Sequence, residues 1–278
     1  MLKICVSITL WKLLGAGLKT SDSLKSSSIS PSSVRNSSRR KNSKSKGLTS
    51  KGCKNKLLLL VGFVGACLLS VQPISMMLAN LQYYGAKNYL DEWQISPSLV
   101  DKSQIANAEQ YAVRAIDLHP SFALYTDSLS AVLQWKALDE EDSLTKMELL
   151  NEAEELNLTS LQHRPSWPAT WANLVYIKWL KNELDDSFQN YLSKASFFGP
   201  NSPEVHSVIA TIGLSLPERN VRLFLVNKEL VKKHLLLGLE HPKAKKAVID
   251  GVLNANKQTL VCSWLKEEST PSPRKLKC

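Results

Sequence analysis

The segment from Leu57 to Ala79, LLLLVGFVGACLLSVQPISMMLA, contains no charged residue. A helix needs about 20 mostly apolar residues to cross the hydrocarbon core of a bilayer. A buried helix of a soluble protein would show a polar stripe, whereas the polar side chains here are Ser70, Gln72 and Ser75. The sequence therefore predicts one transmembrane helix over residues 57–79, with the rest of the chain divided between its two sides.

The formal net charge of +10 is distributed unevenly between the residues before this segment and the rest of the chain. Residues 1–56 carry 13 Lys or Arg against Asp22 alone, which leaves 22 basic and 24 acidic residues in 57–278. A near-neutral body does not indicate a basic nucleic-acid-binding surface, so we expect no nucleic-acid partner. Because Lys and Arg favour the cytoplasmic side of a membrane helix, residues 1–56 are predicted to be cytoplasmic and the body to lie outside.

Residues 21–50 are rich in serine, with scattered Lys, Arg and Asn. This composition cannot bury enough apolar surface to offset chain entropy, so the arm over 1–56 is predicted to be disordered. The arm either attracts anionic lipid head groups or serves only as a topology signal. Within it, residues 2–18 fit either an amphipathic surface helix or an upstream extension of a gene whose true start lies later.

Two other interpretations of the apolar run are weaker. A leader of this length is far longer than the n-region of a cleaved signal peptide, and the run exceeds the usual about 7–15 residues. Val64 to Cys67 is similar to a lipoprotein signal, but the apolar run continues well past Cys67. A small cysteine inside a helix explains it better. Beyond the run, Tyr83, Tyr84 and Trp93 stand where the helix is expected to meet the outer membrane interface.

The body that follows is predicted to be all helical. Apolar residues recur every three or four positions to about Asn256, without an alternating strand pattern. Two residues seven apart, followed by a proline five positions later, occur three times: Ala108, Ala115 and Pro120; Ala153, Ser160 and Pro165; Phe188, Ala195 and Pro200. Small residues seven apart share one helix face and allow a neighbouring helix to approach, while the proline ends the helix.

These offsets resemble the second helix of a tetratricopeptide repeat. They predict three antiparallel helix pairs: 80–93 with 103–118, 122–138 with 145–163, and 169–181 with 185–198. A helix that starts at Pro203 and is broken by Pro217, followed by helices over 227–239 and 242–256, is expected to cap the stack.

The fold class is thus all-α, with four predicted segments: the arm 1–56, the transmembrane helix 57–79, a helical-repeat domain over 80–265 and a flexible tail over 266–278. Cys262 and Cys278 would lie outside the membrane. A disulfide between them is conceivable, and two cysteines near a mobile end fit the unpaired state equally well.

No pattern of catalytic or metal-ligating residues stands out. The five histidines, His119, His163, His206, His234 and His241, have no partners at metal-ligand spacing, and no phosphate loop, HExxH, GxSxG or CxxC motif occurs. Three of the histidines adjoin helix-ending prolines, where capping of the last carbonyls is the ordinary role. We therefore expect no enzymatic activity, cofactor or metal site.

The densest local signal is the segment LQHRPSWPATWANLVYIKWL, which predicts a partner or glycan surface formed by Arg164, Trp167, Trp171 and Trp179. Indole rings stack on sugars, and tryptophan and arginine dominate protein interaction hot spots. Trp171 is also explained by core packing, because it fits the repeat pattern. Trp167, in a turn between two prolines, is the better surface candidate.

The run from Arg164 to Leu214 resembles the RP-x-WP-x-x-WA-x-L … A-x-x-x-GP-x-x-PEV pattern of VpsP-type polysaccharide-biosynthesis proteins. A similar stretch occurs in the periplasmic tail of some O-antigen ligase-like or polymerase-like proteins. Besides the arginine and tryptophans above, the positions that carry the resemblance are Pro165, Pro168, Gly199, Pro200, Pro203 and Glu204. The arm over 1–56 departs from the short leader of that family.

The resemblance implies a bacterial inner-membrane protein with a periplasmic helical body and without a known catalytic residue. The expected function is a non-catalytic, single-pass scaffold that docks other proteins of an exopolysaccharide synthesis or export assembly. One alternative is a glycan-binding module of the same pathway, with Trp167 as a stacking platform. Another is a nucleic-acid-binding protein that uses the basic arm.

Overall fold

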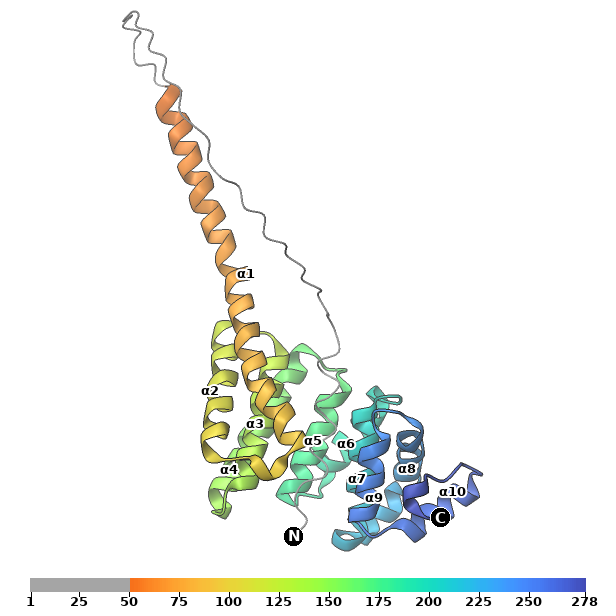
Figure 1. The fold of residues 1–278 in the computed structure, drawn as a ribbon. Coiled ribbons are helices and arrows are strands. Elements are labelled where there is room, and N and C mark those ends of the chain that lie inside the picture. The colour runs from red at the N-terminus through yellow and green to blue at the C-terminus, as the bar shows by residue number, and fades with distance from the viewer. Residues whose placement is uncertain (1–50) are drawn as a thin grey trace, which may run out of the picture. The chain divides into compact units, whose positions relative to one another are not determined.

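The computed structural model describes residues 51–278, without the side chains of 51–59, 64, 66–69 and 99. Most of the arm predicted to be disordered, residues 1–50, lies outside this range. The described chain is helical, with no strand in it, as the sequence predicts (Figure 1). The stretch of the first helix up to Ile74 separates from a compact unit that extends from Ser75 to Cys278. We call this unit the body.

Helix α1 extends from Lys51 to Ile95 without interruption and includes Pro73. The helices that follow are α2 (Lys102–Leu118), α3 (Ala123–Asp139), α4 (Ser143–His163), α5 (Pro168–Lys181), α6 (Asp186–Phe198), α7 (Pro203–Arg219), α8 (Val221–Glu240), α9 (Lys245–Asn254) and α10 (Gln258–Glu267). Two short 3₁₀ helices, η1 (Pro97–Leu99) and η2 (Arg274–Leu276), lie before α2 and near the carboxyl end.

The body is built from antiparallel helix pairs close to the predicted positions. Each of α3, α5 and α7 packs against the helix that follows it, and α5 and α7 also contact each other. The predicted small residues form the close contacts, since Ala108, Ala115, Ala153, Ser160 and Ala195 are all fully buried. The seven-residue spacing therefore identifies helix faces that neighbours approach closely.

Two expectations about the carboxyl-terminal helices are wrong. Pro217 does not break the helix that begins at Pro203, because it lies in the last turn of α7, where the missing N–H removes only one hydrogen bond before the helix ends at Arg219. As a result α8 begins at Val221, earlier than expected. Helix α10, which follows Lys257, is not predicted by the sequence pattern.

The carboxyl end contacts the body at two points, where the sequence leads us to expect a flexible tail over 266–278. Leu276 is buried in the main hydrophobic cluster together with Val261 and Trp264. Two residues later, Cys278 forms a disulfide with Cys262 of α10, with a Cα–Cα distance of 5.4 Å. The apolar side chain and the disulfide together hold the last residues against α9 and α10.

Helix α1 carries large exposed apolar side chains between Leu60 and Ile74. Leu60, Val61, Phe63, Val71 and Ile74 are each more than half exposed. Among the side chains that the structure describes, no helix carries a stretch both long and apolar enough to cross a bilayer. Residues 57–59, 64 and 66–69 of the expected span lie outside that set.

The second half of α1 belongs to the body. The Ser75 hydroxyl donates to the carbonyl of Leu118, and Ala79 is fully buried. Tyr83 and Trp93, which the sequence leads us to expect at a membrane interface, are core residues instead, because α1 continues directly into the first helix pair. Tyr84 remains half exposed.

Gly213 of α7 lies where α8 approaches most closely. A Cβ at this position would be 2.3 Å from Cγ2 of Val231. We predict that Gly213→Ala lowers the free energy of unfolding by about 1–3 kcal/mol, because the extra methyl group overpacks the α7–α8 contact. Urea denaturation followed by circular dichroism measures the change. Gly62→Ala, with no atom within 4 Å of the added Cβ, is the control and should unfold like the parent.

Candidate partner-binding surface

Four turns of one local design connect the helix pairs. The backbone N–H of His119, Arg164, Gly199 and His241 donates to the carbonyl four residues earlier, and a proline follows each of them. The carbonyl of the same residue accepts from the N–H three positions later. The sequence pattern identifies three of these turns through their prolines. The fourth, at His241 and Pro242, lies outside the seven-residue pattern, but the sequence also predicts a helix-ending proline there.

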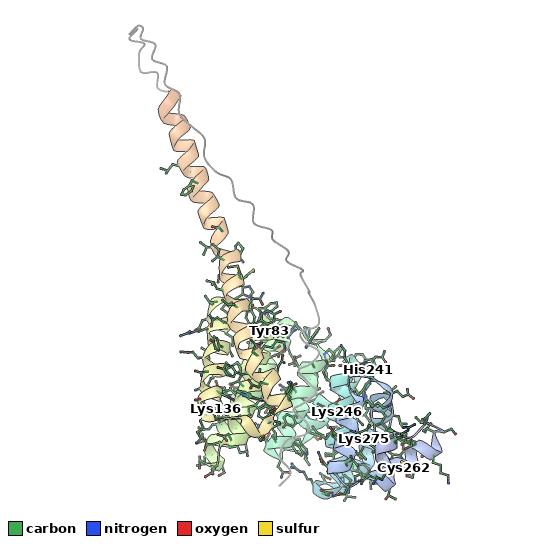
Figure 2. The ribbon with its side chains drawn as sticks, viewed as in Figure 1. Tyr83, Lys136, His241, Lys246, Cys262 and Lys275 are labelled. Carbon is green, nitrogen blue, oxygen red and sulfur yellow. A yellow bond between two sulfur atoms is a disulfide. The ribbon has the colours of Figure 1, made fainter. Side chains whose placement is uncertain are left out.

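All four turns lie at one end of the body. Asp127 near the start of α3 bonds Thr170 near the start of α5, and a Cβ on Gly199 would touch Pro168 of the neighbouring turn. The Ser75–Leu118 hydrogen bond places the beginning of the body's part of α1 beside the first turn. Tyr83 and His241 lie at this end in Figure 2. We call it the turn end; the chain enters the body from residue 74 here.

Arg164 and Trp167 form one side of the second turn. The Arg164 guanidinium lies 4.7 Å from the centroid of the Trp167 ring and bonds the carboxylate of Asp127. Desolvation raises the pKa of Asp127 to about 6 against the opposing effects of Arg164 and Thr170. Trp167 is 37% exposed, and the guanidinium of Arg164 lies over its ring in a cation–π contact. The expectation that Trp167 is a surface residue agrees with this geometry.

Trp171 and Trp179 are engaged inside the body instead. The indole N–H of Trp171 donates to the carbonyl of Pro165, and its ring stacks on Phe198. Trp179 lies near the opposite end of α5, where its N–H donates to the Ser215 hydroxyl. The structure therefore brings Arg164, Trp167 and Trp171 together, and it separates Trp179 from them.

The remaining positions of the family-like pattern are explained by packing of two neighbouring turns. Pro168 and Pro203 occupy the first residues of α5 and α7, where a missing N–H has no cost. Gly199 lies between them, and a Cβ there would come within 2.7 Å of both Pro168 and Val205. Glu204 accepts from the Ser202 hydroxyl at the start of α7. Pro165 and Pro200 follow the helix ends.

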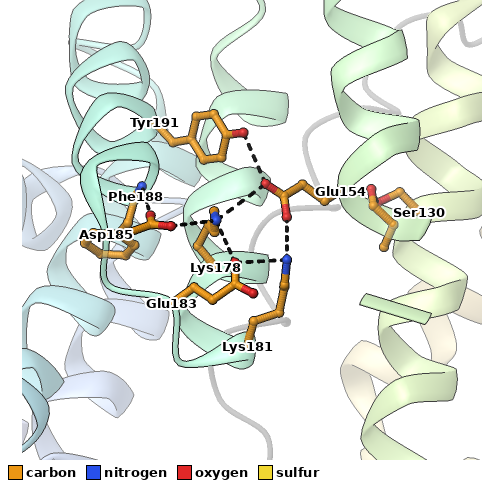
Figure 3. A network of polar contacts seen from close by, with 9 residues as sticks. Ser130, Glu154, Lys178, Lys181, Glu183, Asp185, Phe188 and Tyr191 are labelled. Atoms are coloured by element: carbon orange, nitrogen blue, oxygen red, sulfur yellow. Dashed lines mark hydrogen bonds and ion pairs between the residues drawn. The ribbon is translucent and has the colours of Figure 1, made fainter. Parts of the chain in front are cut away.

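A buried ionic network joins α4, α5 and α6 (Figure 3). Lys178 Nζ lies 2.6 Å from Glu183 Oε2 and 3.0 Å from Asp185 Oδ2, and Lys181 Nζ lies 2.8 Å from Glu154 Oε2. Burial alone would lower the pKa of Lys178, but hydrogen bonds to Glu183 and Asp185 outweigh it and raise that pKa. The network fixes the charged state of Lys178 and has a structural role.

Replacing Lys178 by methionine should lower the free energy of unfolding by about 1–3 kcal/mol, because Asp185 would lose its cation and Glu183 would keep only Lys181. Chemical denaturation measures the loss. Lys136→Met is the control: Lys136 pairs with one carboxylate, Glu109, and its side chain is 40% exposed against 8% for Lys178, so this pair is worth about 0–1 kcal/mol. Equal losses in the two variants would contradict a structural role for the network.

The structure also joins Ser196, His234 and His206 in a hydrogen-bonded chain. Ser196 Oγ lies 2.8 Å from Nε2 of His234, whose Nδ1 lies 2.9 Å from Nδ1 of His206. The order resembles that of a hydrolase relay, but Ser196 lies within α6, whose amides are committed to the helix and cannot stabilise an oxyanion. Sequence reasoning missed this chain, because 28 residues separate the two histidines.

Burial, together with the charge of Lys233, holds the pKa of both His206 and His234 well below the usual value. Each imidazole takes up a proton below about pH 6.5 in the unfolded chain, and only at lower pH in the folded one. The unfolded state binds more protons, so each of these two groups should lower the free energy of unfolding by roughly 1–2 kcal/mol between pH 7 and 5.

Denaturation of the parent and of the His206→Asn/His234→Asn variant at several pH values tests this. The variant should lose less stability between pH 7 and 5, whatever its stability at pH 7. Asp127 acts in the opposite sense, because its raised pKa makes the folded state take up its proton first. It is present in both proteins and cancels in the comparison. Parallel pH profiles would show that the histidines are not held neutral.

Among the described residues, no three His, Cys, Asp or Glu side chains are arranged to hold a metal ion. Comparison of the chain with protein-family models, with curated proteins and with solved structures finds no match in any of the three. The relationship to VpsP-type proteins is therefore a resemblance over residues 164–214 alone.

Proposed function

We propose that this protein is a membrane-anchored helical scaffold, in which the part of α1 before Ser75 is the anchor and the body docks protein partners. The observation that carries the proposal is the set of exposed apolar side chains on α1. Leu60, Val61 and Phe63 point in different directions around the helix, because successive residues are about 100° apart. A single partner helix would cover one stripe, whereas lipid covers every side.

The amino-acid sequence supports the same interpretation of residues 57–74 as a membrane anchor. Residues 57–74 are uncharged and, at about 1.5 Å per residue, have about the length that a bilayer core requires. Because Ser75 bonds Leu118 and Ala79 is fully buried, the proposed span ends near Ile74, a little earlier than expected from the sequence. The Lys and Arg residues before the span favour a cytoplasmic amino terminus and an external body.

The disulfide fits an external body. Cys262 and Cys278 pair in the body, and disulfides persist in oxidising compartments such as the bacterial periplasm. A periplasmic location beside the inner membrane is therefore our proposal for the body.

The form of the body favours partner binding at its helix ends and outer helices. Most side chains of α3, α5 and α7 are buried, so the inner helices offer little open surface to a ligand. A glycan-binding role would depend on Trp167 alone, because Trp171 and Trp179 are engaged. The basic arm, on which a nucleic-acid-binding role would depend, lies outside the described residues.

The assignment to exopolysaccharide synthesis or export rests on the resemblance over 164–214. The positions that carry this resemblance pack two turns together, which is a structural role, so the pathway is a prediction from similarity alone. Loss or alteration of surface polysaccharide when the gene is deleted is the observation that would support it.

The anchor is tested by membrane fractionation and alkaline carbonate extraction of the full chain. The parent should stay in the membrane pellet. Val61→Lys/Phe63→Lys/Val71→Lys should move to the soluble fraction, because a charged residue near the centre of a membrane helix costs about 2.5–3.5 kcal/mol. Leu225→Lys/Val226→Lys, on exposed positions of α8, is the control and should stay in the pellet. Extraction of the parent by carbonate would overturn the proposal.

A further inference from the structure

The turn end of the body carries exposed aromatic side chains. Phe122 is 43% exposed in the first turn, Trp167 is 37% exposed in the second, and Phe197 is 77% exposed in the last turn of α6 before the third. Aromatic rings that are free on one face favour the interfacial layer of a bilayer. One such ring lies at each of three successive turns of this end.

The fourth turn adds exposed cations. Lys243, Lys245 and Lys246 follow His241 and are all exposed, and none of them forms an ion pair that the structure records. Glu240 is the exposed acidic residue beside them. Lysines close to an anionic membrane surface are attracted to it, and the attraction falls off within about a Debye length.

The opposite end of the body carries charges of both signs. Glu183 and Asp185, between α5 and α6, are paired with Lys178, and Lys102 and Arg222 are exposed at the same end. The connection between α3 and α4 contains Glu140, Glu141 and Asp142, which form no ion pair that the structure records. We call this end the acidic end after these three carboxylates, which an anionic surface repels.

The chain enters the body at the turn end. Ser75 bonds Leu118 beside the first turn, and Asn80 accepts from the Tyr125 hydroxyl one helical turn further on. Helix α1 continues without interruption from residue 74 to residue 75. The proposed anchor is therefore attached to the body beside the first turn.

We propose that the turn end is a membrane-docking face, which lays Phe122, Trp167, Phe197, Lys243, Lys245 and Lys246 on an anionic bilayer surface. The inference rests on the proposed anchor, and it adds that the body contacts lipid by its own side chains. The acidic end then faces away from the membrane, toward partners.

The test is amide hydrogen exchange of the full chain reconstituted in vesicles, either of phosphatidylcholine alone or with about one third phosphatidylglycerol. Amides in the four turns, 119–122, 164–167, 199–202 and 241–244, should exchange more slowly in the anionic vesicles. The connections 140–142 and 182–185 at the acidic end should exchange equally in both. Each lysine near the surface should change the docking equilibrium about fivefold.

Two variants make the test specific. Lys243→Glu/Lys246→Glu should remove the protection, whereas the matched charge reversal Lys102→Glu/Arg222→Glu, also at exposed positions but at the other end, should retain it. Phe197→Ser should weaken protection with little cost to folding, because this ring is the most exposed of the three.

Flotation of the vesicles separates the two hypotheses. A chain that floats with both kinds of vesicle but shows the same turn exchange in each overturns the docking face and leaves the anchor intact. A chain that floats with neither overturns the anchor and the docking face together. If the amides of the four turns stay protected in both charge-reversal variants, Lys243 and Lys246 do not cause the protection. This result would also overturn the proposal.

Discussion

Close approach between helices through small side chains is the constraint on which the body depends. Ala108, Ala115, Ala153 and Ala195 have no exposed surface, and each lies on a helix that must pack beside its neighbour at short range. A larger side chain at such a position would separate two helices and displace the turns that join them. The regular placement of the turns at one end of the body therefore depends on these alanines, whose side chains are only a methyl group.

The charged groups inside the body follow the same division between ends. Lys178 and its carboxylate partners lie toward the acidic end, where they hold three helices together. The uncharged chain of Ser196, His234 and His206 lies toward the turn end and joins α6, α7 and α8. Each end thus has its own polar connections between helices: an ionic network at one, and the histidine chain together with the Arg164–Asp127 ion pair at the other.

Much of the fold can be predicted from the sequence, because helix period and proline position are local signals. Five of the six predicted members of the pairs agree with the helices to within a few residues, whereas 80–93 is the last part of the continuous helix α1. Trp167 is partly exposed, in line with the expected surface position. Contacts between distant segments could not be predicted in this way. No spacing rule connects His206 with His234, and the pairing of Cys262 with Cys278 depends on where Leu276 is buried. The prediction that Pro217 breaks its helix is wrong, because a proline in the last turn of a helix removes only one hydrogen bond.

The carboxyl tail has a consequence for growth of the stack. In a row of helix pairs, each pair offers the next an apolar face, so an uncovered last pair is a template on which another copy can add. Here Leu276 is buried in the same cluster as Val261 and Trp264, and the disulfide ties the last residue of the tail to α10. The tail therefore covers part of the apolar surface of the last helices. Reduction of one covalent bond would remove the restraint that keeps Leu276 in this cluster.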